Sequence, residues 1–377
     1  MRIAINTRFL LSNKMEGFGW FTYETSKRMV EAHPEHQFFF FFDRPFDPKF
    51  IFVSNVTPIV IPPPARHALL FIVWFEIGVR RALKKHKIDA FISMDGYLSL
   101  GSKVKQLSVI HDLNFVHNPK DIPFISRQYL LYFFPRFAKK ATRIFTVSTY
   151  SKQDIVATYG ISPDKIDVGH NGANEAFVPI TNTEKQAIRN QFSNGKEYIL
   201  HVGALHKRKN LLRLIEAFNT AVLDADREEN LVIVGSALWK SQEAIFTQLS
   251  EKAKERILFV GHLPQNELVK VVAGAKLFAY IPYFEGFGIP LVEAMRCGTP
   301  VLSGNLTSLP EVGGEAVHYC NPLDVDDISK NLSLLLNDPA LLTQLSREGL
   351  ERSKQFSWNN TAKELWNSLL KVIETKQ

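Results

Sequence analysis

Residues 283–295 have the sequence Tyr-Phe-Glu-Gly-Phe-Gly-Ile-Pro-Leu-Val-Glu-Ala-Met and follow a short apolar run, 277–281, that is typical of a buried strand. The two glycines let the backbone approach a ligand closely, and Pro290 suits the first turn of a helix, where its missing N–H costs nothing. A helix that begins there offers free N–H groups and the positive end of its dipole to an anion such as a diphosphate. The segment predicts a strand, a phosphate-binding loop and a helix. A buried junction capped by Glu285 is the structural alternative.

Short apolar runs alternate with longer stretches of helical period along the whole chain. This alternation is typical of βα units with parallel sheets. Strands are expected near 2–6, 37–42, 58–61, 89–92, 105–110 and 143–147 in the first half, and near 198–203, 231–235, 256–260, 277–281 and 300–302 in the second. Five consecutive phenylalanines, 38–42, predict a strand that is buried on both faces.

The length of 377 residues is sufficient for two domains. The segment 171–182 is rich in Asn, Pro, Thr and Gly and is the expected linker. We therefore predict an α/β protein with two Rossmann-like domains, 1–180 and 181–356, whose parallel sheets face each other across a cleft that binds ligands. Residues 357–377 are expected to form an amphipathic helix that packs back on the first domain.

The two glutamates of the opening segment, Glu285 and Glu293, are separated by seven residues, and Cys297-Gly298-Thr299-Pro300-Val301 and Leu309-Pro310-Glu311-Val312 follow. This pattern resembles the donor-site signature of the retaining glycosyltransferases of family 4, which have the GT-B fold. The resemblance covers nearly the whole chain and is strongest over 197–320. It implies that 1–180 is the acceptor side and that 181–356 binds a nucleotide sugar. It also implies a catalytic Glu285, a ribose-binding Glu293 and backbone contacts to the donor from Gly286, Phe287, Gly288 and Ile289.

Three successive cations, residues 207–209, stand just before an expected helix that begins at Leu211. Cations are unfavourable at the positive end of a helix dipole unless an anion shares the site. The stretch resembles the family's G-x-L-x-x-R-K-N element, which implies that Arg208 and Lys209 grip the nucleotide diphosphate. Ala204 stands where many members have an arginine, so no role is transferred to it. A solvated basic face is the structural alternative.

In the first domain, His111 and Asp112 end a predicted strand, where open α/β sheets place functional groups. The resemblance implies that His111 contacts the donor sugar near the reacting centre, and Asp112 is expected to orient the loop. A packed or capping histidine is the structural alternative.

Residues 16–20, Glu-Gly-Phe-Gly-Trp, resemble the family's glycine-rich loop beneath the diphosphate, so Gly17, Phe18 and Gly19 are donor-binding candidates. The bulk of Phe18 and Trp20 departs from the usual form of that loop. The segment also lacks the G-x-G-x-x-G spacing of a dehydrogenase, which argues against NAD.

Two D-x-D segments, 224–226 and 324–326, have a spacing that binds metal-nucleotide complexes in the other major glycosyltransferase fold. Neither follows an apolar strand, so we expect both to be surface helix ends. No cluster of His, Cys and carboxylates suggests a metal site. We expect no metal and no cofactor, with the nucleotide diphosphate sugar as a substrate.

The positive charge is unevenly distributed, since residues 1–180 hold 23 Lys and Arg against 15 Asp and Glu, whereas the rest of the chain is nearly neutral. Two segments, 67–87 and 127–143, are both basic and aromatic, as expected of helices that lie on an anionic membrane surface. Packing on the sheet with solvated charges is the alternative, and no nucleic-acid recognition motif accompanies the charge. Two cysteines and no leader before the first strand predict a cytoplasmic protein, with peripheral association at the inner face of the cytoplasmic membrane left open.

Together with these features, the resemblance implies a metal-independent, retaining hexosyltransferase that transfers a sugar to a glycan or lipid-linked glycan in bacterial-type polysaccharide or lipopolysaccharide synthesis. The G-x-L-x-x-R-K-N and H-D-L elements together resemble the mannosyltransferase branch of the family, which implies mannose from GDP-mannose. Glucose or N-acetylglucosamine from a UDP donor, a nucleotide-sugar epimerase of the same fold, and a peripheral membrane protein with a degenerate donor site are the alternatives.

Overall fold

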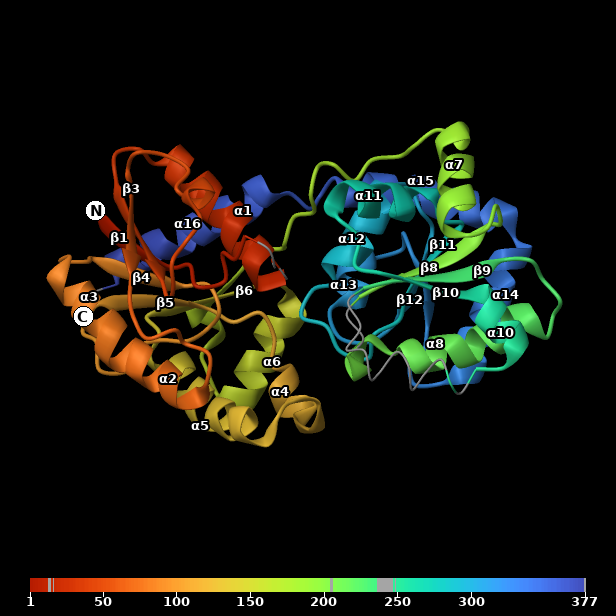
Figure 1. The fold of residues 1–377 in the computed structure, drawn as a ribbon. Coiled ribbons are helices and arrows are strands. Elements are labelled where there is room, and N and C mark those ends of the chain that lie inside the picture. The colour runs from red at the N-terminus through yellow and green to blue at the C-terminus, as the bar shows by residue number, and fades with distance from the viewer. Residues whose placement is uncertain (13–14, 16, 204–205, 236–246, 248, 376–377) are drawn as a thin grey trace. The chain divides into compact units, whose positions relative to one another are not determined.

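The computed structural model describes residues 1–12, 15, 17–203, 206–235, 247 and 249–375 (Figure 1). The chain divides into two compact units, one formed by Met1–Gly172 with Ser357–Gln377 and the other by Ala173–Phe356. Each unit is built around one parallel β-sheet. The first boundary falls within the segment 171–182, and the chain returns to the first unit after Phe356.

The first unit has a seven-stranded sheet in the order β3-β2-β1-β4-β5-β6-β7. Its strands are β1 (Arg2–Asn6), β2 (Gln37–Phe42), β3 (Val56–Val60), β4 (Ala90–Ser93), β5 (Lys105–Val109), β6 (Arg143–Thr146) and β7 (Ile166–Val168). Its helices are α1 (Gly17–Ala32), α2 (Ala68–Ile72), a π-helical continuation (Val73–Val79), α3 (Arg80–Lys85), α4 (Asn114–His117), α5 (Phe124–Lys140), α6 (Thr149–Tyr159) and α16 (Trp358–Glu374). The sequence predicted every strand of this sheet except β7, which is too short to show a period.

The phenylalanine run forms β2, which pairs with β1 on one side and β3 on the other. All five rings are buried, which confirms the expectation of a strand covered on both faces. Phe39 and Phe41 join the apolar cluster that contains Trp74. Phe38 points to the other face, where its ring centroid lies 6.4 Å from that of Trp366 in α16.

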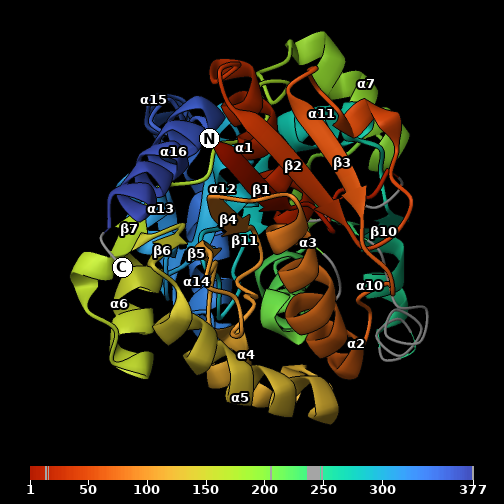
Figure 2. The same cartoon turned by 90° about the vertical axis from the view of Figure 1, so that its left-hand side faces the viewer.

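The terminal helix α16 packs on α1 and on strands β4 to β7 of the first unit, and Figure 2 shows it beside α1. Ser357 caps it by accepting a hydrogen bond from the Asn359 N–H. Lys371 forms an ion pair of 2.7 Å with Asp167 of β7. Burial raises the pKa of Asp167, but hydrogen bonds from Arg143 and from α16 outweigh this effect and hold it at about 2. The helix is therefore fixed to the sheet by charge as well as by its apolar face.

The second unit has a six-stranded sheet in the order β10-β9-β8-β11-β12-β13. Its strands are β8 (Tyr198–Val202), β9 (Asn230–Val234), β10 (Ile257–Gly261), β11 (Leu277–Tyr280), β12 (Val301–Gly304) and β13 (His318–Cys320). Its helices are α7 (Asn182–Phe192), α8 (Leu211–Phe218) with a π-helical continuation (Asn219–Leu223), α10 (Glu251–Arg256), α11 (Gln265–Gly274), α12 (Ile289–Arg296), α13 (Leu309–Gly313), α14 (Val325–Asn337) and α15 (Pro339–Ser353). Here the short edge strand β13 was not predicted.

The middle of this second sheet determines where its functional loops lie. Strand β11 pairs in parallel with β8 on one side and with β12 on the other. The loops that leave the carboxyl ends of these three strands therefore meet at one edge of the sheet, which is where parallel α/β sheets bind ligands. The segments 206–210, 281–288 and 305–308 all lie at this edge.

Candidate active site

The cation segment after β8 forms one 3₁₀ turn, Lys207–Lys209, directly before α8. The turn ends at Asn210, whose φ of 62° is left-handed. The side-chain amide of Asn210 donates to the carbonyl of Ile281 at 3.1 Å and to that of Pro322 at 2.5 Å. Asn210 thus ties the cation turn to the loop that leaves β11.

Glu285 joins the two sequence motifs that the chain keeps far apart. Its Oε1 accepts from the Arg208 guanidinium at 2.6 Å and from the Lys209 ammonium at 2.7 Å. Lys209 also donates to the Tyr280 hydroxyl at 3.1 Å and lies 5.1 Å from the centroid of that ring. The structure therefore brings Arg208, Lys209 and Glu285 together in one cluster at the sheet edge.

The charges of this cluster do not cancel. Burial raises the pKa of Glu285, but Lys209 and Arg208 outweigh burial and hold its pKa at about 2. Glu285 is therefore ionised at every physiological pH and offsets one of the two cations. The three side chains together carry a net charge of +1, and their charge-assisted donors suit an anionic ligand.

The backbone of Glu285 is also fixed. Its N–H donates to the Thr307 hydroxyl at 3.2 Å, and the Ser308 hydroxyl donates to its carbonyl at 2.9 Å. Thr307 has a φ of 60°, which is uncommon for a branched residue and typical of functional sites. Thr307 and Ser308 carry no motif signal in the sequence and were not predicted, and neither was Tyr280, the last residue of β11.

The glycine segment leads into α12 as predicted, with Pro290 in the first turn. Gly288 has a φ of 97°, and a Cβ there would lie 2.8 Å from Leu309, so the position requires glycine. The side chain of Phe287 is buried against Phe356, with ring centroids 5.6 Å apart. The segment 286–288 therefore presents mainly backbone just before α12.

Glu293 lies one turn inside α12. Burial raises its pKa to about 7, and among the described residues no cation offsets this effect. The two glutamates of the motif thus differ in charge, because Glu285 is always ionised whereas Glu293 titrates near neutrality.

In the first unit, His111 follows β5. Its Nε2 lies 2.9 Å from the Met94 carbonyl. A carbonyl only accepts, so Nε2 carries the hydrogen and Nδ1 has the lone pair. Burial lowers the pKa of His111, and the rings of Phe18 and Phe21 each lie 4.7 Å away. His111 is thus a neutral, fixed imidazole, and Asp112 orients its turn by accepting from the Asn114 N–H at 2.9 Å.

The prediction of a loop over 16–20 is wrong for its described part. Helix α1 begins at Gly17, so Gly17, Phe18 and Gly19 form its first turn. A Cβ on Gly19 would lie 2.9 Å from the Phe9 carbonyl, so close packing accounts for this glycine. Glu16 lies outside the described residues, as do Ala204 and Leu205 of the other motif. Contact of Gly17, Phe18 and Gly19 with the donor stays a prediction.

Both D-x-D segments are helix ends, as predicted. Asp224 caps the π-helical turn that follows α8, and Asp226 has a left-handed φ of 52° just beyond it. Asp324 caps α14 by accepting from the N–H groups of Asp326 and Asp327. Nowhere in the described ranges do three His, Cys, Asp or Glu side chains gather as a metal site would require.

The two basic and aromatic segments form α2 to α3 and α5. Exposed apolar side chains project from both, and α2 contacts α5. The most exposed are Leu69 at 77%, Ile125 at 73% and Phe124 at 65%. The segments also carry exposed cations: Arg80, Arg81, Lys84, Lys85, Arg136, Lys139 and Lys140. None of the described helices has the length and hydropathy that a membrane span needs.

Two family models match the chain, one for each half. The model described as Glycosyltransferase Family 4 matches residues 15–177, and the model described as Glycosyl transferases group 1 matches residues 182–352. Among curated proteins, the O-antigen chain mannosyltransferase B of Escherichia coli is 28% identical over 267 residues, 70% of each chain. The serotype-specific mannosyltransferase WbdA of the same species is 28% identical over 72% of this chain, which spans 34% of that relative's length.

Solved structures share the architecture. WaaG, a glycosyltransferase involved in lipopolysaccharide biosynthesis, superposes with a TM-score of 0.76 at 16% identity over 96% of this chain and 98% of its own. Anabaena HepE, in complex with UDP and glucose, superposes with a TM-score of 0.77 at 16% identity over 98% of this chain and 99% of its own. The motifs, the two parallel-sheet units and these matches agree: the chain belongs to the family 4 glycosyltransferases and has the GT-B fold.

Proposed function

We propose that this glycosyltransferase is a retaining, metal-independent mannosyltransferase that moves mannose from GDP-mannose to a hydroxyl of a glycan or lipid-linked glycan. The named relatives, O-antigen chain mannosyltransferase B and WbdA, support the sugar and the synthesis of a bacterial-type polysaccharide or lipopolysaccharide. The cluster of Arg208, Lys209 and Glu285 is the observation that carries the proposal, because its excess positive charge lies beside the start of α12.

In this proposal the diphosphate of the donor binds between the two cations and the free N–H groups of α12. The bond from the anomeric carbon to the phosphate oxygen breaks, and negative charge develops on the leaving diphosphate. Arg208 and Lys209 stabilise that charge and take the role that a metal ion has elsewhere. Glu285 holds both cations in place through one oxygen. Glu293 accepts a hydrogen bond from the ribose.

The acceptor hydroxyl attacks the same face of the sugar that the diphosphate leaves, so the configuration is retained. Its proton passes to the departing phosphate oxygen, which balances the step without a protein nucleophile. His111 contributes the lone pair of Nδ1 as a fixed acceptor for a sugar hydroxyl, since its Nε2 hydrogen is occupied by Met94. Exclusion of water protects the donor from hydrolysis.

A thermal-shift panel of GDP-mannose, UDP-glucose and UDP-N-acetylglucosamine tests the donor. GDP-mannose at 100 times its Kd should stabilise the protein by about 2.7 kcal/mol, and the shift should persist in EDTA. A larger shift with a UDP-sugar would assign a uridine donor instead. Free nucleotide that appears only when an acceptor is present would exclude an epimerase. No shift with any donor would contradict the proposal and favour a degenerate donor site.

We also propose that α2 to α3 and α5 bind the inner face of the cytoplasmic membrane, because their exposed apolar side chains are accompanied by cations. Wild-type protein should sediment with vesicles containing phosphatidylglycerol and be released by salt. Phe124→Ser with Ile125→Ser should reduce this binding at least tenfold. Leu323→Ser, which removes a side chain of 55% exposure from the second unit, is the matched control. Equal binding to neutral phosphatidylcholine vesicles, or no effect of the double variant, would contradict the proposal.

A further inference from the structure

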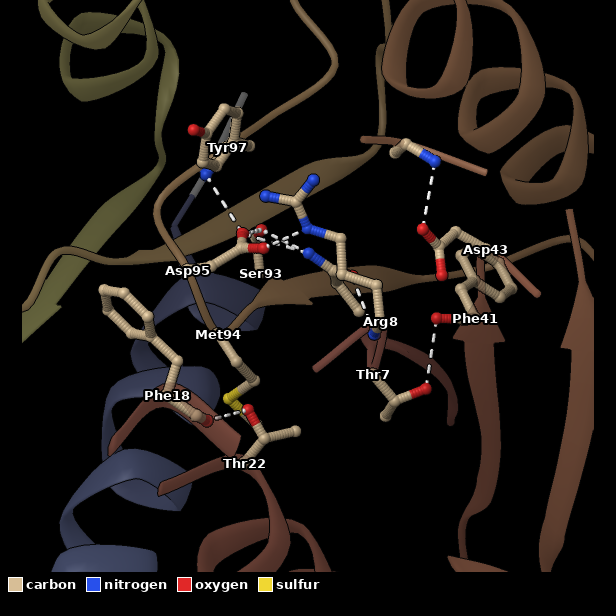
Figure 3. Close-up of polar contacts among 12 residues, drawn as sticks. Thr7, Arg8, Phe18, Thr22, Phe41, Asp43, Ser93, Met94, Asp95 and Tyr97 are labelled. Carbon is tan, nitrogen blue, oxygen red and sulfur yellow. Dashed lines mark hydrogen bonds and ion pairs between the residues drawn. The ribbon is translucent and has the colours of Figure 1, made fainter. Parts of the chain in front are cut away.

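Arg8 is a buried arginine that the proposed transfer does not use. It follows β1 at the carboxyl edge of the first sheet and is only 5% exposed. Its Nε forms an ion pair of 2.6 Å with Asp95, which follows β4 in the same sheet (Figure 3). Buried arginines are normally hydrogen-bonded on several of their five N–H groups, so the other partners of this pair matter.

Both carboxylate oxygens of Asp95 accept hydrogen bonds. One oxygen accepts from Arg8, and the other accepts from the Asn6 amide at 3.0 Å, the Ser93 hydroxyl at 2.9 Å and the Tyr97 N–H at 3.3 Å. The carboxylate is therefore fixed and satisfied, and it anchors Arg8 through Nε alone.

Apart from an interaction with the Tyr97 hydroxyl, the two terminal nitrogens of Arg8 have no hydrogen-bond partner within the part of the chain that the structure describes. They are not among the unpartnered atoms that are sealed from solvent, so the small exposed part of Arg8 includes this end. A charged group that keeps unused N–H donors at an otherwise buried site is costly unless a ligand satisfies them.

Aromatic rings hold the guanidinium in place. Its central carbon lies 4.5 Å from the ring centroid of Tyr97 and 4.9 Å from those of Phe9 and Phe71. Phe75 adds a fourth ring at 5.5 Å. Rings around a fixed guanidinium restrict its rotation, so its donors are preorganised for a ligand.

The net charge of the groups around Arg8 indicates a neutral ligand rather than a phosphate. Asp43 lies nearby and pairs with Arg44 at 2.6 Å, while its other oxygen also accepts from the Ala65 N–H at 2.9 Å. Two cations and two carboxylates leave no net charge here, in contrast to the positive cluster around Glu285. Hydrogen-bond donors without net charge, bordered by aromatic rings, suit the neutral hydroxyl oxygens of a sugar.

The backbone connects this site to His111. Met94 stands between Ser93 and Asp95, and its carbonyl is the group that accepts from His111. The Asp95 carboxylate that anchors Arg8 is thus one residue from the carbonyl that fixes the imidazole. Both side chains lie at the carboxyl edge of one sheet, where ligands of such folds bind.

We propose that Arg8 is an acceptor-binding residue whose terminal nitrogens donate to hydroxyl oxygens of the acceptor glycan. The inference rests on the proposed function, because a transferase needs a second substrate and the cations of the second unit are assigned to the donor. It adds the site in this chain that recognises the acceptor and the chemistry of that recognition: neutral sugar hydroxyls rather than phosphate or carboxylate.

The test is the variant Arg8→Lys. Its ammonium can still pair with Asp95, but the side chain lacks the two terminal nitrogens of the guanidinium. NMR titrations use methyl α-mannoside, methyl α-glucoside and mannose 1-phosphate as probes. We expect a neutral glycoside to bind the wild type and to lose at least tenfold in affinity in Arg8→Lys. In turnover assays the acceptor KM should rise by at least the same factor while the donor KM is unchanged. Arg44→Lys, which changes the neighbouring pair, should alter neither.

Two results would overturn the inference. The first is that no neutral probe binds, or that every neutral probe binds the wild type and Arg8→Lys equally well. The second is that only mannose 1-phosphate binds in a way that depends on Arg8, which would assign an anionic ligand. If Arg8→Lys does not fold, the double variant Arg8→Met with Asp95→Asn removes both charges together. We expect it to show the same loss of affinity for the neutral glycoside. The donor panel is independent of these titrations, so failure of donor binding would reject the proposed function without deciding the role of Arg8.

Discussion

We expect Lys209→Ala to lower kcat about 10²–10³-fold, the scale of losing one preorganised electrostatic partner of a developing charge. The Lys209 ammonium is held between Glu285 at 2.7 Å and the Tyr280 hydroxyl at 3.1 Å, so it is placed before the donor binds. Because its charge is needed most when the diphosphate leaves, kcat should fall more than the affinity for the donor does. Single-turnover rates with saturating GDP-mannose measure this effect.

Lys207→Ala is the matched control for Lys209→Ala. Lys207 belongs to the same 3₁₀ turn, but its side chain is exposed whereas that of Lys209 is buried. Its removal changes the net charge of the protein equally and should lower kcat less than threefold, because exposed charges are screened. Equal losses in the two variants would indicate a general charge effect and reject the role of Lys209. A lowered melting temperature in Lys209→Ala alone would be corrected for by comparing rates at a temperature where both are folded.

The elements that carry a strong period were predictable. The run 38–42 is apolar at every position, as expected of a strand that is covered on both faces, and β2 is such a strand. Pro290 and the glycines before it located the start of α12 because each has a specific backbone preference. The edge strands β7 and β13 have three residues each, too few for a pattern, and their pairing depends on the neighbouring strand.

The candidate site was only partly predictable, because its key contacts are tertiary. Arg208 and Glu285 belong to separate motifs, and nothing in either one indicates that they share a hydrogen bond of 2.6 Å. The αL conformation of Asn210 and the contact of Thr307 with the Glu285 N–H likewise follow from how β8, β11 and β12 lie side by side. Gly19 was expected in a loop because 16–20 resembles a glycine-rich loop, whereas in the structure it belongs to α1 and lets that helix approach the Phe9 carbonyl.

The second large effect is expected for Glu285→Gln, which should lower kcat by roughly 10²-fold. The amide cannot hold Arg208 and Lys209 by charge, so the two cations lose the group that positions them. Removing one partner of a buried ion pair should also cost about 3–5 kcal/mol of stability, because uncompensated charge stays buried. The same excess charge should favour a diphosphate, so GDP should raise the melting temperature of Glu285→Gln more than that of the wild type. Equal shifts would contradict the placement of the diphosphate at these cations.

The pH profile separates the two glutamates of the motif. Since the pKa of Glu285 is held at about 2, this carboxylate stays ionised between pH 5 and 9 and causes no change in the pH profile there. The pKa of Glu293 is raised to about 7, so this carboxyl is protonated below neutrality and ionised above it. If it accepts from the ribose, donor affinity should rise as pH increases from 6 to 8, and the diphosphate of a nucleotide sugar does not titrate in this range. The rise should persist in Glu285→Gln, at a lower kcat throughout, and disappear in Glu293→Gln. A rise that survives in Glu293→Gln would show that another group controls donor binding.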